Sequence, residues 1–202
     1  MIVYVESNFV LEIALRQEQL ESCNSIIQLA EESKLQLVLP AYSLVEPYEV
    51  IRRHAIQRKK FSNELKNELQ QILRSESYKE ETVTILKVGD LLLKSGEDAK
   101  QQLEEMILRL IKASMTIPLT ADIITNAIEF QVKNTFSPQD SLVYASVISH
   151  LKSAPNEEKC FLNRNSKDFD DPEIVKELDR YGCKIMFQFT HAFDFLKNKL
   201  SK

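Results

Sequence analysis

Four short apolar segments, rich in β-branched and large aliphatic residues and each followed by polar residues, predict β-strands. They cover residues 2–5, 35–39, 159–162 and 183–187. Their hydrophobic character is nearly continuous, which is typical of parallel strands covered on both faces. Because ligands of open parallel sheets bind beyond the carboxyl ends of the strands, the polar residues that follow these segments are the first candidates for a functional site.

Between the predicted strands, apolar residues recur at the three- and four-residue spacing of amphipathic helices. This pattern is longest over residues 55–113, where one apolar stripe runs along 61–73 and another along 103–111. We expect the dipeptide Ser95-Gly96 to form a turn between two helices. The inserted helices could serve as a clamp for RNA, as a dimer surface or as an enlarged helical wall.

The alternation of strands and helices predicts an α/β fold, a three-layer α/β/α arrangement with a parallel sheet of four to five strands. The length of 202 residues suits a single domain, 1–202, with a helical insertion at about 55–113. Only three glycines and six prolines occur, which disfavours an all-β fold rich in tight turns.

The formal net charge of −4 gives the chain no overall attraction to nucleic acid, so RNA binding would need a local basic patch. The three cysteines lack metal-ligand spacing and fit the reduced thiols of a cytosolic protein. The chain shows no signal-peptide pattern and no apolar run of roughly 18 residues. We therefore expect a cytoplasmic protein without a membrane span.

Acidic residues recur where predicted strands end and where predicted helices start. Glu6 follows the first strand, and Glu46 lies among apolar neighbours just past the second. Asp140 lies in the first turn of a helix that Ser137 is predicted to cap. The third strand runs into the polar segment 163–169. If the sheet is parallel, these acids approach one edge of it.

In this order, the four places resemble the motifs of the PIN-domain family, the nuclease fold of bacterial toxin ribonucleases and RNA-processing enzymes. Residues 6–8 (Glu-Ser-Asn) are similar to the family's Asp-Thr/Ser-Asn triplet, and Glu46 and Asp140 to its second and third acids. Residues 161–169 resemble a strand that runs into Thr-Arg-Asp or Thr-Arg-Asn, followed by Asp-Phe. Two residues depart from the pattern: Glu6 replaces an aspartate, and Asn165 stands where many members carry their last acid.

The resemblance implies a metal-dependent endoribonuclease that hydrolyses single-stranded RNA, with an antitoxin protein as partner if the chain is the toxin of a toxin–antitoxin pair. Carboxylates that converge on one point repel one another, and Mg²⁺ or Mn²⁺ would offset that repulsion. The implied catalytic residues are Glu6, Glu46, Asp140 and Asp168, of which Glu6, Asp140 and Asp168 would bind the metal. Ser7, Asn8 and Asn165 would hold ligands and waters, and Arg164, Lys167, Arg52 and Arg53 would contact RNA phosphates.

Other interpretations stay open. Taken alone, Asp140 could be only a helix cap and Glu6 only a surface residue at a strand end. The chain could be a PIN-like module that has lost cleavage and binds RNA or protein, and the inserted helices could form a homodimer. A phosphatase of the haloacid-dehalogenase type is excluded, because it needs a second aspartate two residues after the first, where this chain has Asn8.

Overall fold

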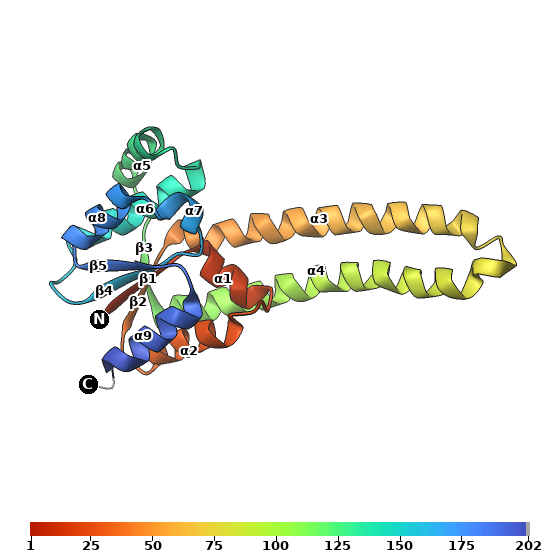
Figure 1. Cartoon of the computed structure of the whole chain (residues 1–202), viewed down its shortest axis with the longest axis horizontal. Coiled ribbons are helices and arrows are strands. Elements are labelled where there is room, and N and C mark those ends of the chain that lie inside the picture. Colours follow the sequence, from red (N-terminus) through yellow and green to blue (C-terminus); the bar gives the residue numbers. More distant parts are fainter. Residues whose placement is uncertain (201–202) are drawn as a thin grey trace.

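A computed structural model, which describes residues 1–200, contains a parallel sheet between two layers of helices (Figure 1). The predicted three-layer α/β/α fold is therefore confirmed. The sheet has five strands in the order β3-β2-β1-β4-β5. The strands are β1 (Ile2–Val5), β2 (Gln36–Pro40), β3 (Ser114–Ile117), β4 (Lys159–Leu162) and β5 (Cys183–Met186).

The two helical layers belong to two separate apolar cores. Helices α1, α2 and α9, with the inner ends of α3 and α4, cover one face of the sheet, and α5 to α8 cover the other. Along β1, Val3 and Val5 point into the first core, whereas Ile2 and Tyr4 point into the second. The helices are α1 (Ser7–Ala14), α2 (Leu20–Glu31), α3 (Ala41–Ile72), α4 (Lys79–Ala113), α5 (Ala121–Asn134), α6 (Pro138–Leu151), α7 (Ser166–Phe169), α8 (Pro172–Arg180) and α9 (Phe189–Leu200).

The sequence pattern did not predict strand β3. This strand lies at the edge of the sheet, pairs only with β2, and follows α4 without an intervening turn. Of its four residues only Ile117 is buried, so it lacks the continuous apolar character of the central strands. An edge strand of this kind gives little hydrophobic signal.

The strand order reverses between β1 and β4, and this reversal determines where a site can form. From β1 the chain crosses outward to β2 and β3 on one side, whereas β4 and β5 lie on the other. In open parallel sheets, such a switch point leaves a crevice beyond the carboxyl ends of the two central strands. Here those ends are Val5 and Leu162, which are followed directly by Glu6 and Asn163.

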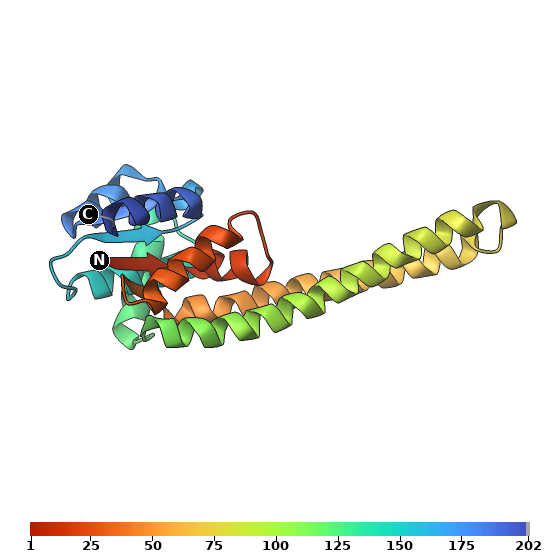
Figure 2. The ribbon, with the colours of Figure 1, turned by 90° about the horizontal axis from the view of Figure 1, so that it is seen from below.

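Helices α3 and α4 form an antiparallel hairpin that extends far beyond the layered body (Figures 1 and 2). The predicted turn at Ser95-Gly96 is wrong, because α4 is continuous through both residues and the reversal lies at residues 73–78. A Cβ at Gly96 would meet the Cβ of Ala55 on α3 at 3.5 Å, an ordinary van der Waals contact. Gly96 thus faces the neighbouring helix from within α4, a position that local turn statistics do not detect.

Within residues 1–200, no helix combines the length and the apolar character that crossing a bilayer requires.

Candidate active site

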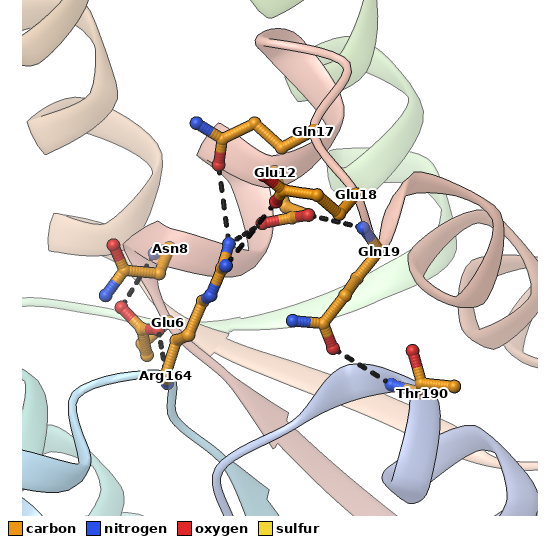
Figure 3. Close-up of polar contacts among 8 residues, drawn as sticks. All are labelled: Glu6, Asn8, Glu12, Gln17, Glu18, Gln19, Arg164 and Thr190. Carbon is orange, nitrogen blue, oxygen red and sulfur yellow. Dashed lines mark hydrogen bonds and ion pairs between the residues drawn. The ribbon is translucent and has the colours of Figure 1, made fainter.

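Glu6 lies at the switch point and caps helix α1. Its extended backbone (φ −128°) lets the side chain turn back, so that Oε2 accepts a hydrogen bond from the Asn8 N–H at 2.7 Å. Oε1 accepts from the Arg164 N–H of the β4–α7 loop at 3.4 Å (Figure 3). The residue is only 5% exposed, and this burial raises its pKa from 4.5 to about 7 against the opposing effect of the backbone donors. The charge of Glu46 adds to the increase.

Glu46 approaches the same edge from helix α3, in the second turn after β2. Its carboxylate accepts a hydrogen bond from the hydroxyl of Ser7, the first residue of α1. Burial raises the pKa of Glu46, and the negative charge of Asp140 raises it further, whereas Ser7 and Arg53 lower it. The second predicted acid therefore lies within electrostatic range of the first and the third.

Asp140 and Asp168 are joined through Asn165. The Asn165 side-chain amide donates to Asp168 Oδ2 at 2.7 Å and lies 3.3 Å from Asp140 Oδ1. Ser137 caps α6 as predicted, accepting from the Asp140 N–H at 3.1 Å, and its hydroxyl donates to Asp140 Oδ2. Asp140 thus takes part in the cap of α6 and also belongs to the cluster of Glu6, Glu46, Asp140 and Asp168, which we call the acidic group. Its two interpretations therefore do not exclude each other.

Comparisons with known proteins show the family of the chain. A family model described as a PIN domain matches residues 3–169. The chain belongs to the PIN-domain family. PIN domains are generally nucleases. A search of curated proteins returned no match. Among solved structures, VapBC2 from Rickettsia felis, crystallised with a DNA fragment from its promoter, is similar with a TM-score of 0.47 and 11% identity, over 92% of this chain and 99% of that one.

In this PIN domain the four acids come from four different segments that meet at one edge of the sheet. They are Glu6 after β1, Glu46 on α3, Asp140 on α6 and Asp168 on α7. Most of the groups bonded to them are neutral: the hydroxyls of Ser7 and Ser137, the amide of Asn165 and backbone N–H groups.

The donor set of this edge is chemically suited to a hard divalent cation. It consists of carboxylate and amide oxygens, which Mg²⁺ and Mn²⁺ prefer. Burial, and to a smaller extent the charge of a neighbouring acid, raises the pKa values of Glu6 and Glu46, so a bound cation would favour their ionised forms. As the side chains stand, no three acidic, histidine or cysteine residues among positions 1–200 are close enough to share one ion. The donor chemistry therefore suits a divalent cation, whereas the described side chains do not form a closed site for one.

The four predicted phosphate contacts differ in their surroundings. Arg52 makes two hydrogen bonds to Glu49, at 2.8 and 2.9 Å, on the exposed surface of α3. Lys167 is exposed on α7. Arg53 lies close enough to Glu46 to lower its pKa. Of the four, Arg53 interacts with the acidic group through its charge, and Arg164 does so through its backbone N–H.

The side chain of Arg164 turns away from the acidic group (Figure 3). Its guanidinium pairs with Glu12, a carboxylate of α1 that is 0% exposed, and lies 3.5 Å from both Gln17 and Glu18. Glu12 also accepts from the Gln19 N–H at 2.6 Å. This ion pair holds the β4–α7 loop against α1, and so places the Arg164 N–H that bonds Glu6.

The sequence analysis missed two residues that shape the site. Glu12 is an acid within the apolar segment 9–14, and that pattern could have marked it as a buried charge in need of a partner. Asn163 is 1% exposed, and its Oδ1 accepts from the Asn165 N–H at 2.8 Å. It stands where the PIN motif has threonine, and its amide fixes the loop that carries Asn165 and Asp168.

Proposed function

We propose that this protein is a metal-dependent endoribonuclease that hydrolyses phosphodiester bonds of single-stranded RNA. The observation that carries the proposal is the gathering of Glu6, Glu46, Asp140 and Asp168 at the switch point, with the pKa of Glu6 raised to about 7. Several partly buried acids held close together lower the stability of the fold, which supports a functional role for them.

Glu6, Asp140 and Asp168 are the residues that would hold Mg²⁺ or Mn²⁺. When bound, such an ion lowers the pKa of a coordinated water and offsets the negative charge that develops on the phosphate. Asn165 keeps Asp140 and Asp168 at a fixed separation through its amide. Asn8 contributes its backbone N–H to the orientation of Glu6.

Glu46 is suited to orient the attacking water and to take its proton. Burial raises the pKa of Glu46, which brings the carboxylate closer to the value that suits a general base near neutral pH. The Ser7 hydroxyl donates to one oxygen of this carboxylate, and the other oxygen would hold the water. Arg53, whose charge acts on Glu46, would contact the RNA phosphate together with Arg52 and Lys167.

A second candidate function is a PIN-like module that binds RNA or protein without cutting. The observation in its favour is Glu6 itself, whose two oxygens already accept backbone N–H groups. We also propose a single cytoplasmic domain over residues 1–202, with the hairpin as its insertion, and an antitoxin protein as the partner if the enzyme acts as a toxin.

The test is cleavage of a fluorescent single-stranded RNA panel by wild-type protein and by Asp140→Asn. We expect wild-type protein to cut the RNA with Mg²⁺ or Mn²⁺ and not with EDTA. The cleavage rate of Asp140→Asn should be at least about 100-fold lower, since replacing even a residue that only supports a metal ligand can lower activity by that much. Asp170→Asn is the matched control, because it removes an exposed carboxylate two residues from Asp168.

Intact RNA with wild-type protein and both metals would overturn the enzyme proposal. If that protein still bound the RNA, and Arg53→Ala weakened the binding, the binding module would be the better description. Equal activity of wild type and Asp140→Asn would show that the acidic group is not where cleavage occurs.

A further inference from the structure

A polar cavity lies at the base of the hairpin, where the end of α1 meets α3 and α4 (Figure 1). Its volume is about 580 Å³, and its lining includes Arg16 after α1, His54 and Arg58 on α3, and Lys94 on α4. Asp98 is the one carboxylate among the described residues that line it. We call this space the hairpin-base cavity. The whole chain has a net charge of −4, so this excess of positive charge is a local feature.

The cations of the hairpin-base cavity are not paired with carboxylates. Arg58 is half-buried, and its guanidinium donates a hydrogen bond at 3.0 Å to a neutral group, the Ser95 hydroxyl. Arg16 and Lys94 are exposed. Among residues 1–200, none of these three side chains forms an ion pair. Because a partly buried cation is unfavourable without a counter-charge, the cavity favours an anionic ligand.

The lining of the cavity suits RNA better than a protein partner. Gln17, Gln101 and Gln102 add side-chain amides, which can donate to and accept from the edges of unpaired bases. Phosphate groups are the anions that Arg and Lys side chains contact along a nucleic-acid strand. A protein partner would bury large apolar side chains at the centre of its interface, whereas the described lining offers only Leu15 and two alanines.

The hairpin-base cavity and the acidic group lie at opposite ends of α1. Ser7, the first residue of the helix, donates to Glu46, and Leu15, which follows the last residue, lines the cavity. The eight residues of α1 rise by about 12 Å. Gln17 also lines the cavity and lies 3.5 Å from the Arg164 guanidinium (Figure 3). At about 3.4 Å or more between successive phosphates, a strand of a few nucleotides can reach both places.

We propose that the hairpin-base cavity binds phosphates of the RNA strand whose scissile bond lies at the acidic group. This inference rests on the proposed function, because it concerns the same substrate at a second place along the strand. Arg58, held by Ser95, would contact one phosphate, and Arg16 and Lys94 would contact that phosphate or its neighbours. The inserted hairpin then contributes to substrate binding through its base.

The first experiment measures binding alone. Fluorescence anisotropy follows a labelled single-stranded RNA in EDTA, which prevents metal-dependent cleavage, for wild type and a double variant with Arg16→Gln and Lys94→Gln. We expect the double variant to bind at least about 10-fold more weakly. The slope of log affinity against log salt concentration should become shallower by about 1.4, because two phosphate contacts are lost. Far-UV circular dichroism checks that the variant keeps its helices.

The matched control is a double variant with Lys59→Gln and Lys100→Gln. It also removes two exposed cations near the hairpin base, and Lys59 is the direct neighbour of Arg58. Both residues, however, line a different cavity between α3 and α4. We therefore expect the control to bind the RNA much more tightly than the variant with Arg16→Gln and Lys94→Gln.

The second experiment measures cleavage of the same RNA with Mg²⁺. The substitutions Arg16→Gln and Lys94→Gln should raise KM and leave kcat unchanged, because both residues hold the strand away from the scissile bond. An unchanged KM would show that the strand bound in the cavity is not the strand that is cut, and would overturn the proposal.

Equal binding of RNA by wild type and the variant with Arg16→Gln and Lys94→Gln would overturn the proposal, as would equal weakening by the control or no binding by wild type. If ATP bound wild type but not this variant, while RNA bound both equally, the cavity would hold a free nucleotide instead. Weakened binding of an RNA that wild-type protein does not cut would support the cavity and contradict cleavage. The two proposals therefore fail separately.

Discussion

Replacing Glu6 by glutamine should make the stability of the protein less sensitive to pH. The Glu6 carboxyl is 5% exposed, and its removal from water raises its pKa from 4.5 to about 7. The hydrogen bonds from the Asn8 and Arg164 N–H groups favour the ionised form, but they do not outweigh burial. The folded protein therefore retains a proton that the unfolded chain releases near pH 4.5.

The sign and size of the effect follow from linkage. Between pH 4.5 and about 7 the folded state binds more protons at Glu6 than the unfolded state, so the free energy of unfolding falls as the pH rises. The contribution is fully present below pH 4.5 and lost above about pH 7. At about 1.4 kcal/mol per pKa unit, the whole change is about 3 kcal/mol. For a chain of this length, that corresponds to roughly 6–12 °C in the melting temperature.

The assay is urea unfolding, followed by circular dichroism, of wild type and Glu6→Gln at pH 4.5 and pH 8 in the presence of EDTA. The chelator is needed because a bound dication would favour the ionised carboxylate. The free energy of unfolding of Glu6→Gln, relative to wild type, should rise by about 3 kcal/mol between the two pH values. Asp170→Asn, which removes an exposed carboxylate, should show no such change. Equal differences at both pH values would refute the reasoning, since Glu6 would then ionise as it does in water.

Two further predictions concern stability. Arg164→Met should lower the free energy of unfolding by about 2–4 kcal/mol, because it leaves the Glu12 carboxylate, which is 0% exposed, without its partner. Glu12→Gln should lower it by only about 1 kcal/mol, because the Arg164 guanidinium that it leaves is 38% exposed to water. Urea unfolding measures both values, and the reverse order would contradict the argument. In the hairpin, Gly96→Ala should raise the free energy of unfolding by up to about 1 kcal/mol, because the new Cβ meets Ala55 at an ordinary 3.5 Å. Gly89→Leu should lower it by about 1–3 kcal/mol, because the larger side chain forces α3 and α4 apart. A destabilised Gly96→Ala would contradict the ordinary contact between Gly96 and Ala55.

The parts of the fold that the sequence predicted depend on local chemistry. The central strands are recognisable because both faces of the sheet are covered, which leaves continuous apolar runs such as residues 2–5. The cap of α6 is recognisable because Ser137 and Asp140 satisfy each other within one turn. Four acids that follow predicted strands or begin predicted helices suggested that they meet at one edge of the sheet. The position of a residue at the end of a strand does not by itself specify which side chains come into contact.

The errors arose where a distant part of the chain determines the structure. Ser95-Gly96 has the composition of a turn, but Gly96 faces Ala55, a residue 41 positions away, and remains helical. Strand β3 depends on pairing with β2 for its conformation. The partner of Glu12 is Arg164, which is 152 positions away along the chain. In each case the deciding contact is tertiary, and the residues nearby in the sequence indicate a different local structure or no partner at all.

The glutamate in place of the family's aspartate acquires a specific meaning from the structure. At the N-terminus of α1, the longer side chain of Glu6 reaches both the Asn8 N–H and the Arg164 N–H, and so links the ends of β1 and β4. Helix capping favours the ionised carboxylate. Burial opposes it, and the pKa of about 7 shows that burial prevails. A cation beside Asp140 and Asp168 would reverse that balance, because it would stabilise the charge that the protein alone does not. Glu6 therefore stabilises the fold most in its protonated form, whereas cation binding requires it to be ionised.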